Sequence, residues 1–111
     1  MSLLSALINR GVDTDGDGRI STSEASAVRS LDISNESVSD LGGIDSFTNL
    51  DTLICEYNLL TEMDVSENPG LLYLACGWNY DLARLDLSKN TALKHLSCSS
   101  LSLTGLDVTS N

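Results

Sequence analysis

Three cysteines recur at nearly even intervals, and this periodicity constrains the fold more than any other feature of the chain. Cys55, Cys76 and Cys98 lie 21 and 22 residues apart in the 111-residue sequence. Each cysteine comes two residues after a leucine, and each of those leucines comes three residues after another leucine. Self-similarity at a fixed period of roughly 20–50 residues is typical of proteins built from stacked structural repeats. The length suits a single domain, and we therefore predict one domain of stacked units.

The repeated pattern, L-x-x-L-x-C-x-x-N-x-L, matches the leucine-rich-repeat signature. Leucine and cysteine alternate with period two, which places both on the inward face of a short strand. Since no repeat can bury its apolar face alone, stacking is expected to build a continuous core with a parallel sheet on one side. We predict an α/β fold, a short leucine-rich-repeat solenoid. Its repeats are assigned to a degenerate unit at 28–49, with a helical turn near 42–47, followed by 50–70, 71–92 and 93–111.

Columns of asparagine and cysteine accompany the leucines. Asn58 and Asn79 follow the predicted strands, where an amide can satisfy backbone groups of the bend, whereas Leu101 replaces asparagine in the third repeat. A ladder with one thiol per repeat, and no histidine or acid beside it, does not converge on a metal ion. Buried free thiols are therefore expected, with a disulfide or a metal site as the alternative.

Residues 13–24 match the EF-hand calcium loop D-x-[DN]-x-[DN]-G-x5-E at every specified position. The acids would supply carboxylates, Arg19 only its backbone carbonyl, and Ser21 its hydroxyl or a water molecule, while Gly18 permits the sharp turn. An acidic, glycine-rich turn without metal is the alternative. The predicted ligands of Ca²⁺ are Asp13, Asp15, Asp17, Arg19, Ser21 and Glu24.

The segments beside this loop have helical character. Apolar residues at 3, 4, 7 and 8 have helical spacing, and Ser21 or Thr22 can cap a second helix that runs to about Val28. EF-hand loops that act as switches usually occur in pairs, so a single loop is interpreted as structural. We predict that residues 1–27 form a helix–calcium-loop–helix cap over the apolar end of the first repeat.

The combination of these motifs resembles known proteins. The chain resembles secreted or surface leucine-rich-repeat proteins of gut bacteria. The resemblance lies in the T-D-G-D-G-x-I-S-x-x-E segment, the D-L-G-G-I segment at 40–44, and the L-x-x-L-x-C-x-x-N repeats with their L-D-V-S-x-N spacers. The repeats are also loosely similar to those of internalins. This resemblance implies a secreted or cell-surface location and a role in binding or adhesion. The loop is similar to the calcium segments of dockerins as well, but those carry two loops.

The charge balance excludes several classes of partner. The formal net charge is −10, with 16 acidic residues against 6 basic ones. Nucleic acids and anionic membranes are bound through lysine and arginine, so neither is expected as a partner. Acidity favours both cation binding and solubility. No apolar run approaches the roughly 18 residues of a membrane span, and the stretch at 3–8 is too short for a signal peptide.

Aromatic residues concentrate between positions 57 and 80. On the predicted strands Tyr57, Tyr73 and Trp78 point to the outer, concave face, where aromatic side chains typically anchor a partner. A module that binds a protein or glycan is therefore predicted, and the alternative is a structural N-terminal cap or spacer of a longer repeat protein. No enzyme is expected, because His95 is the single histidine and lies beside no recognisable nucleophile motif.

The last predicted repeat, 93–111, has no capping segment after it in the sequence. An open strand edge and an apolar end favour association with a second copy. End-to-end self-association or weak solubility is therefore expected, unless further repeats of a longer natural protein cover this end.

Overall fold

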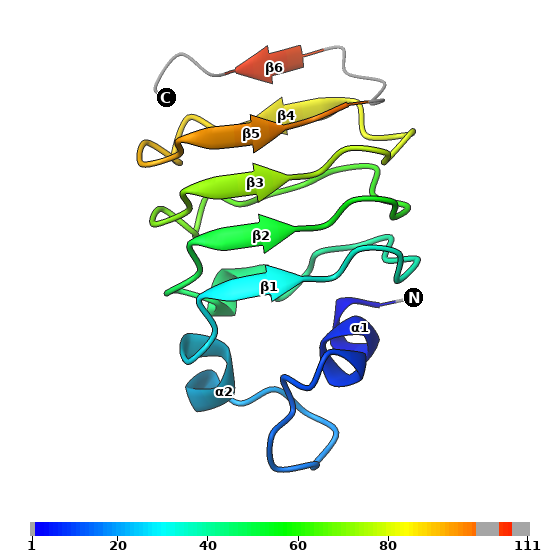
Figure 1. The fold of residues 1–111 in the computed structure, drawn as a ribbon, viewed down its shortest axis with the longest axis vertical. Helices are drawn as coiled ribbons and strands as arrows, with labels where there is room; N and C mark the ends of the chain where they lie inside the picture. Colours follow the sequence, from blue (N-terminus) through cyan, green and yellow to red (C-terminus); the bar gives the residue numbers. More distant parts are fainter. Residues whose placement is uncertain (1, 100–104, 108–111) are drawn as a thin grey trace.

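A four-stranded parallel sheet dominates the computed structural model, which describes residues 2–99 and the backbone of 105–107. Leucine pairs with leucine along the whole sheet, so like residues stack over like. Figure 1 shows the strands of this sheet side by side. This confirms the predicted parallel sheet. In spatial order the strands are β1 (Ser30–Asp32), β2 (Thr52–Ile54), β3 (Tyr73–Ala75) and β5 (His95–Ser97).

A second sheet, which the sequence analysis did not predict, is made by the second halves of the repeats. It joins β4 (Arg84–Asp86) and β6 (Gly105–Asp107) in parallel, with Leu85 opposite Leu106. In β4 the buried Leu85 lies between two exposed residues, which is the alternation of a half-buried strand. In Figure 1, β4 lies behind β5, and β6 lies beyond β5 at the end of the stack. The predicted exposed end of repeat 93–111, and Leu101, lie outside the described residues.

Helical segments occur where they were expected. Helix α1 (Leu3–Asn9) and helix α2 (Thr22–Ser26) flank the acidic loop, and a 3₁₀ turn, η1 (Ile44–Ser46), lies in the degenerate repeat. Helix α2 begins with a capping box between Ser21 and Glu24 and ends two residues before the predicted Val28. No helix among the described residues is long and apolar enough to span a membrane.

The hydrophobic core runs without a break from α1 to the repeats. Leu3, Leu7 and Ala25, from the two helices, belong to the same buried cluster as Leu31 of β1. The inward leucines of the central repeats are fully buried, and so is Cys55. The residues before 28 therefore pack on the first repeat rather than forming a separate core.

A ladder of buried asparagine amides links neighbouring repeats at the ends of the strands. The Asn58 Nδ2 donates to the carbonyls of Ile33 and Cys55 at 2.9 and 3.0 Å. The Asn79 Nδ2 donates to those of Cys55 and Cys76 at 3.1 and 2.9 Å. Asparagine was predicted to satisfy the bend of its own repeat, and the structure shows that each amide also binds the preceding repeat.

A second asparagine column performs the same task in the other half of the repeats. The Asn68 Nδ2 donates to the carbonyls of Ile44 and Phe47, both at 3.0 Å. The Asn90 Nδ2 donates to those of Val65 and Asn68 at 2.9 and 3.0 Å. Both Asn68 and Asn90 are fully buried, so their amides satisfy carbonyls that water cannot reach.

Gly77 lies where the backbone of the next repeat comes closest, and we expect Gly77→Ala to lower the free energy of unfolding by about 1–3 kcal/mol. A Cβ at this position would lie 3.0 Å from the Ser99 carbonyl oxygen and 3.2 Å from the Glu56 Oε2. Urea denaturation measures the change. Gly70→Ala is the matched control, because a Cβ there would meet only the Leu50 carbonyl oxygen at 3.8 Å. Equal stabilities for the two variants would contradict the close approach.

Candidate functional site

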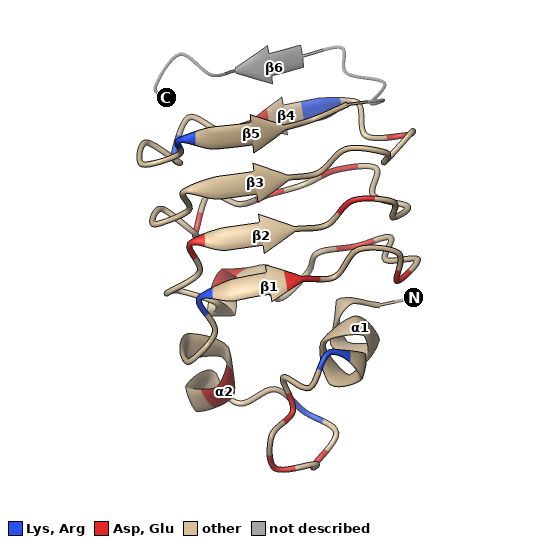
Figure 2. Ribbon diagram, viewed as in Figure 1, with Lys and Arg blue, Asp and Glu red and all other residues tan. Residues whose placement is uncertain are grey.

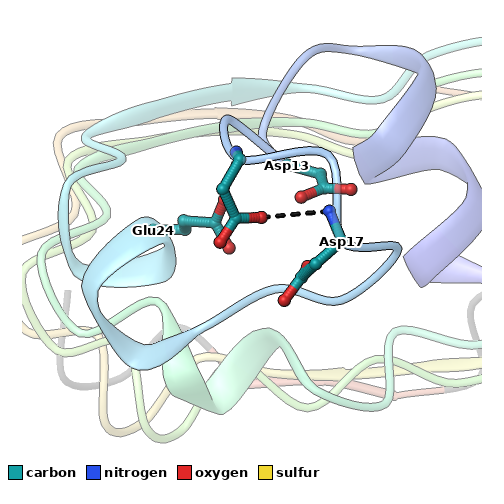
Figure 3. A group of neighbouring side chains, drawn as sticks. Asp13, Asp17 and Glu24 are labelled. Carbon is teal, nitrogen blue, oxygen red and sulfur yellow. Dashed lines mark hydrogen bonds between the residues drawn. The ribbon is translucent and has the colours of Figure 1, made fainter.

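Four carboxylates converge at the centre of the loop between α1 and α2. Figure 3 shows Asp13, Asp17 and Glu24 directed toward one another across the loop. One oxygen from each of these residues and one from Asp15 all lie within 4.8 Å of each other. A donor set made only of carboxylate oxygens suits a hard cation such as Ca²⁺. The structure thus brings together the four acidic residues that the sequence predicted as ligands.

Backbone N–H groups hold this loop in its curved shape. The two carboxylate oxygens of Asp13 accept hydrogen bonds from Gly16 N and Gly18 N at 3.1 and 2.9 Å. The Asp15 Oδ1 accepts from Asp17 N at 3.1 Å, a bond drawn as a dashed line in Figure 3. Gly18 has a φ of 79°, a left-handed conformation that glycine adopts at low cost. The loop is therefore already closed around its carboxylates.

The carboxylates of the loop repel one another. The N–H of Asp17 lowers the pKa of Asp15, but hydrogen bonding to the Asp13 side chain and proximity to the Asp17 carboxylate shift it upward overall. Like charges at short range disfavour ionisation, and a bound cation removes this penalty. In contrast, the backbone N–H groups of Ser21, Thr14 and Asp15 lower the pKa of Glu24 to about 2. Glu24 is thus ionised at neutral pH and available to a cation.

Arg19 and Ser21, the other two predicted ligands, have roles in the loop backbone. The Arg19 N–H donates to the Asp17 Oδ1 at 2.9 Å. The Ser21 Oγ accepts from Glu24 N at 3.1 Å, while the Glu24 Oε1 accepts from Ser21 N at 2.8 Å. These bonds place Glu24 on the first turn of α2, as predicted. Coordination by the Arg19 carbonyl and the Ser21 hydroxyl stays a prediction.

Polar contacts join the loop and its helices to the first repeats. The Arg10 Nε donates to the Glu36 Oε1 at 2.9 Å, and the Arg10 Nη2 donates to the Ser34 carbonyl at 2.7 Å. On the other helix, the Ser26 carbonyl accepts from the Asn49 Nδ2 at 2.8 Å. Both helices are therefore tied to the repeats by side chains as well as by the shared core.

A cluster of aromatic residues forms a second candidate site, which we call the aromatic patch: Tyr57 and Tyr80, which are exposed, and Trp78, which is half-buried. The rings of Tyr57 and Trp78 are stacked, with centroids 5.4 Å apart and planes 5° apart. Tyr80 meets Trp78 edge-on at 6.3 Å and 76°. Tyr57 is 50% and Tyr80 63% exposed. Much apolar surface therefore faces solvent at this point.

The structure places Tyr57 and Trp78 in turns rather than on the strands. Each lies three residues beyond a strand end, in the left-handed conformation, with φ values of 56° and 61°. Asn35 occupies the same position of the first repeat with a φ of 58°. Both aromatic residues were predicted to lie on the concave sheet face. That placement is wrong because the strands are only three residues long, so period-two alternation ends before these positions.

Tyr73, the third predicted binding residue, belongs to a different stack. It lies at the start of β3, opposite His95 of β5, and the two rings are 4.5 Å apart and 2° from parallel. The predicted residues therefore divide between the two ends of the strands. Tyr80 and His95 were not predicted as members of these clusters, although the 22-residue spacing between Tyr73 and His95 was a usable signal.

The cysteines of the column are unpaired, and two of the three are fully buried. Cys55 and Cys76 are fully buried free thiols, as predicted, and Cys98 is only half-buried. Burial raises the pKa of the Cys76 thiol to about 12 and raises that of Cys55 well above its ordinary value. Thiols of this kind are poor nucleophiles and poor metal ligands, so Cys55 and Cys76 act as core residues.

Comparison with known proteins agrees with the repeat architecture. No family model matches the chain. A 49-residue stretch of this chain is 43% identical to internalin J of Listeria monocytogenes serotype 4b. The match covers 44% of this chain and 5% of internalin J. This chain resembles the internalins. A solved structure, described as a functional domain of internalin J that includes a cysteine ladder, matches 83% of this chain with a TM-score of 0.79 and 42% identity.

A second solved internalin of the same species matches 98% of this chain with a TM-score of 0.50 and 17% identity, a likeness of fold alone. This chain covers 20% of the solved internalin J domain and 46% of the second internalin. The similarity to internalins supports a leucine-rich-repeat protein. The cysteine ladder named for the solved internalin J domain has a parallel in the column of three cysteines of this chain.

Proposed function

We propose that this chain is a calcium-stabilised leucine-rich-repeat module of a secreted or cell-surface protein, and that it binds a protein partner through the aromatic patch. The observation that carries this proposal is the stacked pair Tyr57–Trp78 on two neighbouring repeats, in which Tyr57 is exposed and Trp78 is half-buried. Exposed aromatic side chains in a contiguous cluster are typical anchors of protein interfaces. The likeness to internalins supports the location and the binding role.

Residues 1–27 are proposed as the cap and residues 28–111 as the repeats of a short solenoid. Leu3, Leu7 and Ala25 cover the apolar end of the first repeat, where Leu31 would otherwise meet water. Calcium at the loop would hold α1 and α2 at a set distance. Asp13, Asp15, Asp17 and Glu24 would bind it through carboxylates.

A binding module explains the aromatic patch better than a spacer does. A spacer needs only the buried core and the asparagine ladders, and Tyr80 lies outside both. Its 63% exposure leaves most of a large aromatic side chain in water. Such a side chain becomes useful once a partner covers it, because burial of aromatic area dominates interface energetics.

The proposal is tested by selecting a phage-displayed library of random 12-residue peptides on the immobilised chain at about 1 mM calcium. Selected peptides are then titrated by calorimetry against the wild type, Tyr57→Ala and Ile8→Ala. We expect at least tenfold weaker binding by Tyr57→Ala, about 1.4 kcal/mol. Ile8→Ala is the control, since Ile8 is 40% exposed on α1. It is expected to bind as the wild type does.

Other outcomes would contradict the proposal in different ways. Selected peptides that bind Tyr57→Ala and the wild type equally would place the binding surface elsewhere on the chain. A library that yields no binder, together with a glycan array that yields one, would replace the protein partner by a carbohydrate. Failure of both screens would favour a structural spacer.

A further inference from the structure

We infer that the aromatic patch takes an arginine side chain of its partner, with the guanidinium stacked on the rings and paired with Glu56. This inference rests on the proposed function and names the chemistry of the partner segment. It is carried by the position of Glu56, by the backbone conformation of Tyr57 and Trp78, and by the charge around them.

The carboxylate of Glu56 lies over Gly77, the residue next to Trp78. A Cβ on Gly77 would meet the Glu56 Oε2 at 3.2 Å. Glu56 and Gly77 occupy equivalent positions of neighbouring repeats, so the side chain of one fills the space that glycine leaves on the other. The Glu56 carboxylate therefore lies between the turn that carries Tyr57 and the turn that carries Trp78.

This carboxylate has no partner within the described part of the chain. The ion pairs among these residues join Arg10 to Asp32 and Arg10 to Glu36, and no described side chain or N–H donates to the Glu56 carboxylate. Glu56 is half-buried, which removes part of its water shell. A partly desolvated, unpaired carboxylate on the residue next to the exposed Tyr57 is a site for a cation.

The backbone at the patch does not favour aromatic residues. Tyr57 and Trp78 adopt left-handed φ values, where bulky side chains are strained and asparagine or glycine is preferred. The first repeat has Asn35 at this position, in keeping with that preference. Tyr57 and Trp78 are therefore not explained by the local fold, and a binding role accounts for them.

Charge around the patch points to a cationic partner. Acidic residues lie on the turns that follow the strands, basic residues lie just before β1 and β5, and further basic residues lie in β4 and at α1 (Figure 2). Asp32 and Glu36 share the single Arg10, so this end of the sheet keeps an excess of negative charge. Such a surface attracts a basic segment and disfavours an acidic one.

Arginine fits this arrangement better than lysine. Its guanidinium is planar, stacks on aromatic faces and offers paired N–H donors to one carboxylate. The outer face of the half-exposed Tyr57 ring can hold the guanidinium plane, and Glu56 can accept its two N–H groups. A lysine ammonium is a compact, strongly hydrated charge that uses only one part of this site.

The test follows the emission of Trp78, the only tryptophan in the chain. The full chain at saturating calcium is titrated with a pentapeptide of two arginines and three glycines, and with the same peptide carrying neutral citrulline. We expect a saturable change with the arginine peptide and at least tenfold weaker binding of the citrulline peptide. Glu56→Gln is expected to weaken binding of the arginine peptide at least tenfold.

Asp64→Asn is the matched control, because it removes the same charge from an exposed carboxylate that accepts hydrogen bonds only from Ser66 among the described residues. It is expected to change the dissociation constant less than twofold. Equal effects of Asp64→Asn and Glu56→Gln on the dissociation constant would mean that the peptide is held only by diffuse electrostatic attraction, which would overturn the inference. Library peptides that need Tyr57 but lack arginine and tolerate Glu56→Gln would also overturn it, while leaving the proposed function intact.

Discussion

Calcium at about one hundred times its dissociation constant is expected to raise the free energy of unfolding by about 2.7 kcal/mol, because a ligand that binds only the folded state shifts the equilibrium by mass action. For a chain of this size the midpoint of thermal unfolding should rise by roughly 10 °C. Removal of the ion with a chelator is expected to reverse the shift. The measurement is thermal unfolding followed by circular dichroism.

Glu24→Gln is expected to abolish this response, because Glu24 is the carboxylate that α2 contributes to the cluster. Asp13→Ala is expected to do the same from the other side of the loop. Glu62→Gln is the matched control, since Glu62 is an exposed acid outside the loop. A calcium response that survives Glu24→Gln, or equilibrium dialysis that detects no bound calcium in the wild type, would refute the calcium site.

Asn79→Ala is expected to lower the free energy of unfolding by about 3 kcal/mol or more, because each buried polar group left without a partner costs about 1–3 kcal/mol. The Asn79 side chain is fully buried and donates to the carbonyls of Cys55 and Cys76. Its Oδ1 also accepts from Leu60 N at 3.1 Å. Truncation therefore leaves the Cys76 carbonyl and the Leu60 N–H, on two repeats, without these partners, whereas the Cys55 carbonyl keeps the bond from the Asn58 Nδ2.

Urea denaturation measures this effect, with Thr61→Ala as the control at an exposed position close by. The control is expected to change the free energy of unfolding by less than about 0.5 kcal/mol. A loss below about 1 kcal/mol in Asn79→Ala would mean that water replaces the amide. The ladder would then contribute little to the cohesion of the repeats.

Much of the architecture could be predicted because it depends on local rules that repeat. The alternation of Leu53 and Cys55 defines an inward face, and the regular spacing to Leu74 determines which residues stack. The capping box of Ser21 and Glu24 is likewise a local motif, written within four residues. Such features need no knowledge of distant parts of the chain.

Other features could not be predicted from the sequence, because they depend on which residues are exposed and on the register between neighbouring repeats. The alternating residues around Leu85 resemble those of many exposed loops, so they did not indicate a strand. The segment is a strand because β4 pairs with β6. The length of each strand also escaped prediction, so Tyr57 was placed on the sheet face instead of in a left-handed turn. Periodicity defines which residues face inward, but it does not mark the residue at which a strand ends.

The sequence by itself determined the repeat, the inward leucines and the acidic loop, because each of these is encoded by residues at short and regular spacing. Only the tertiary structure decided which side chains from different repeats meet. The stack of Tyr57 on Trp78, and Glu56 over Gly77, arise from residues 21 positions apart. Their contact depends on the register between turns and on the space that glycine leaves, and both follow from packing of the whole core.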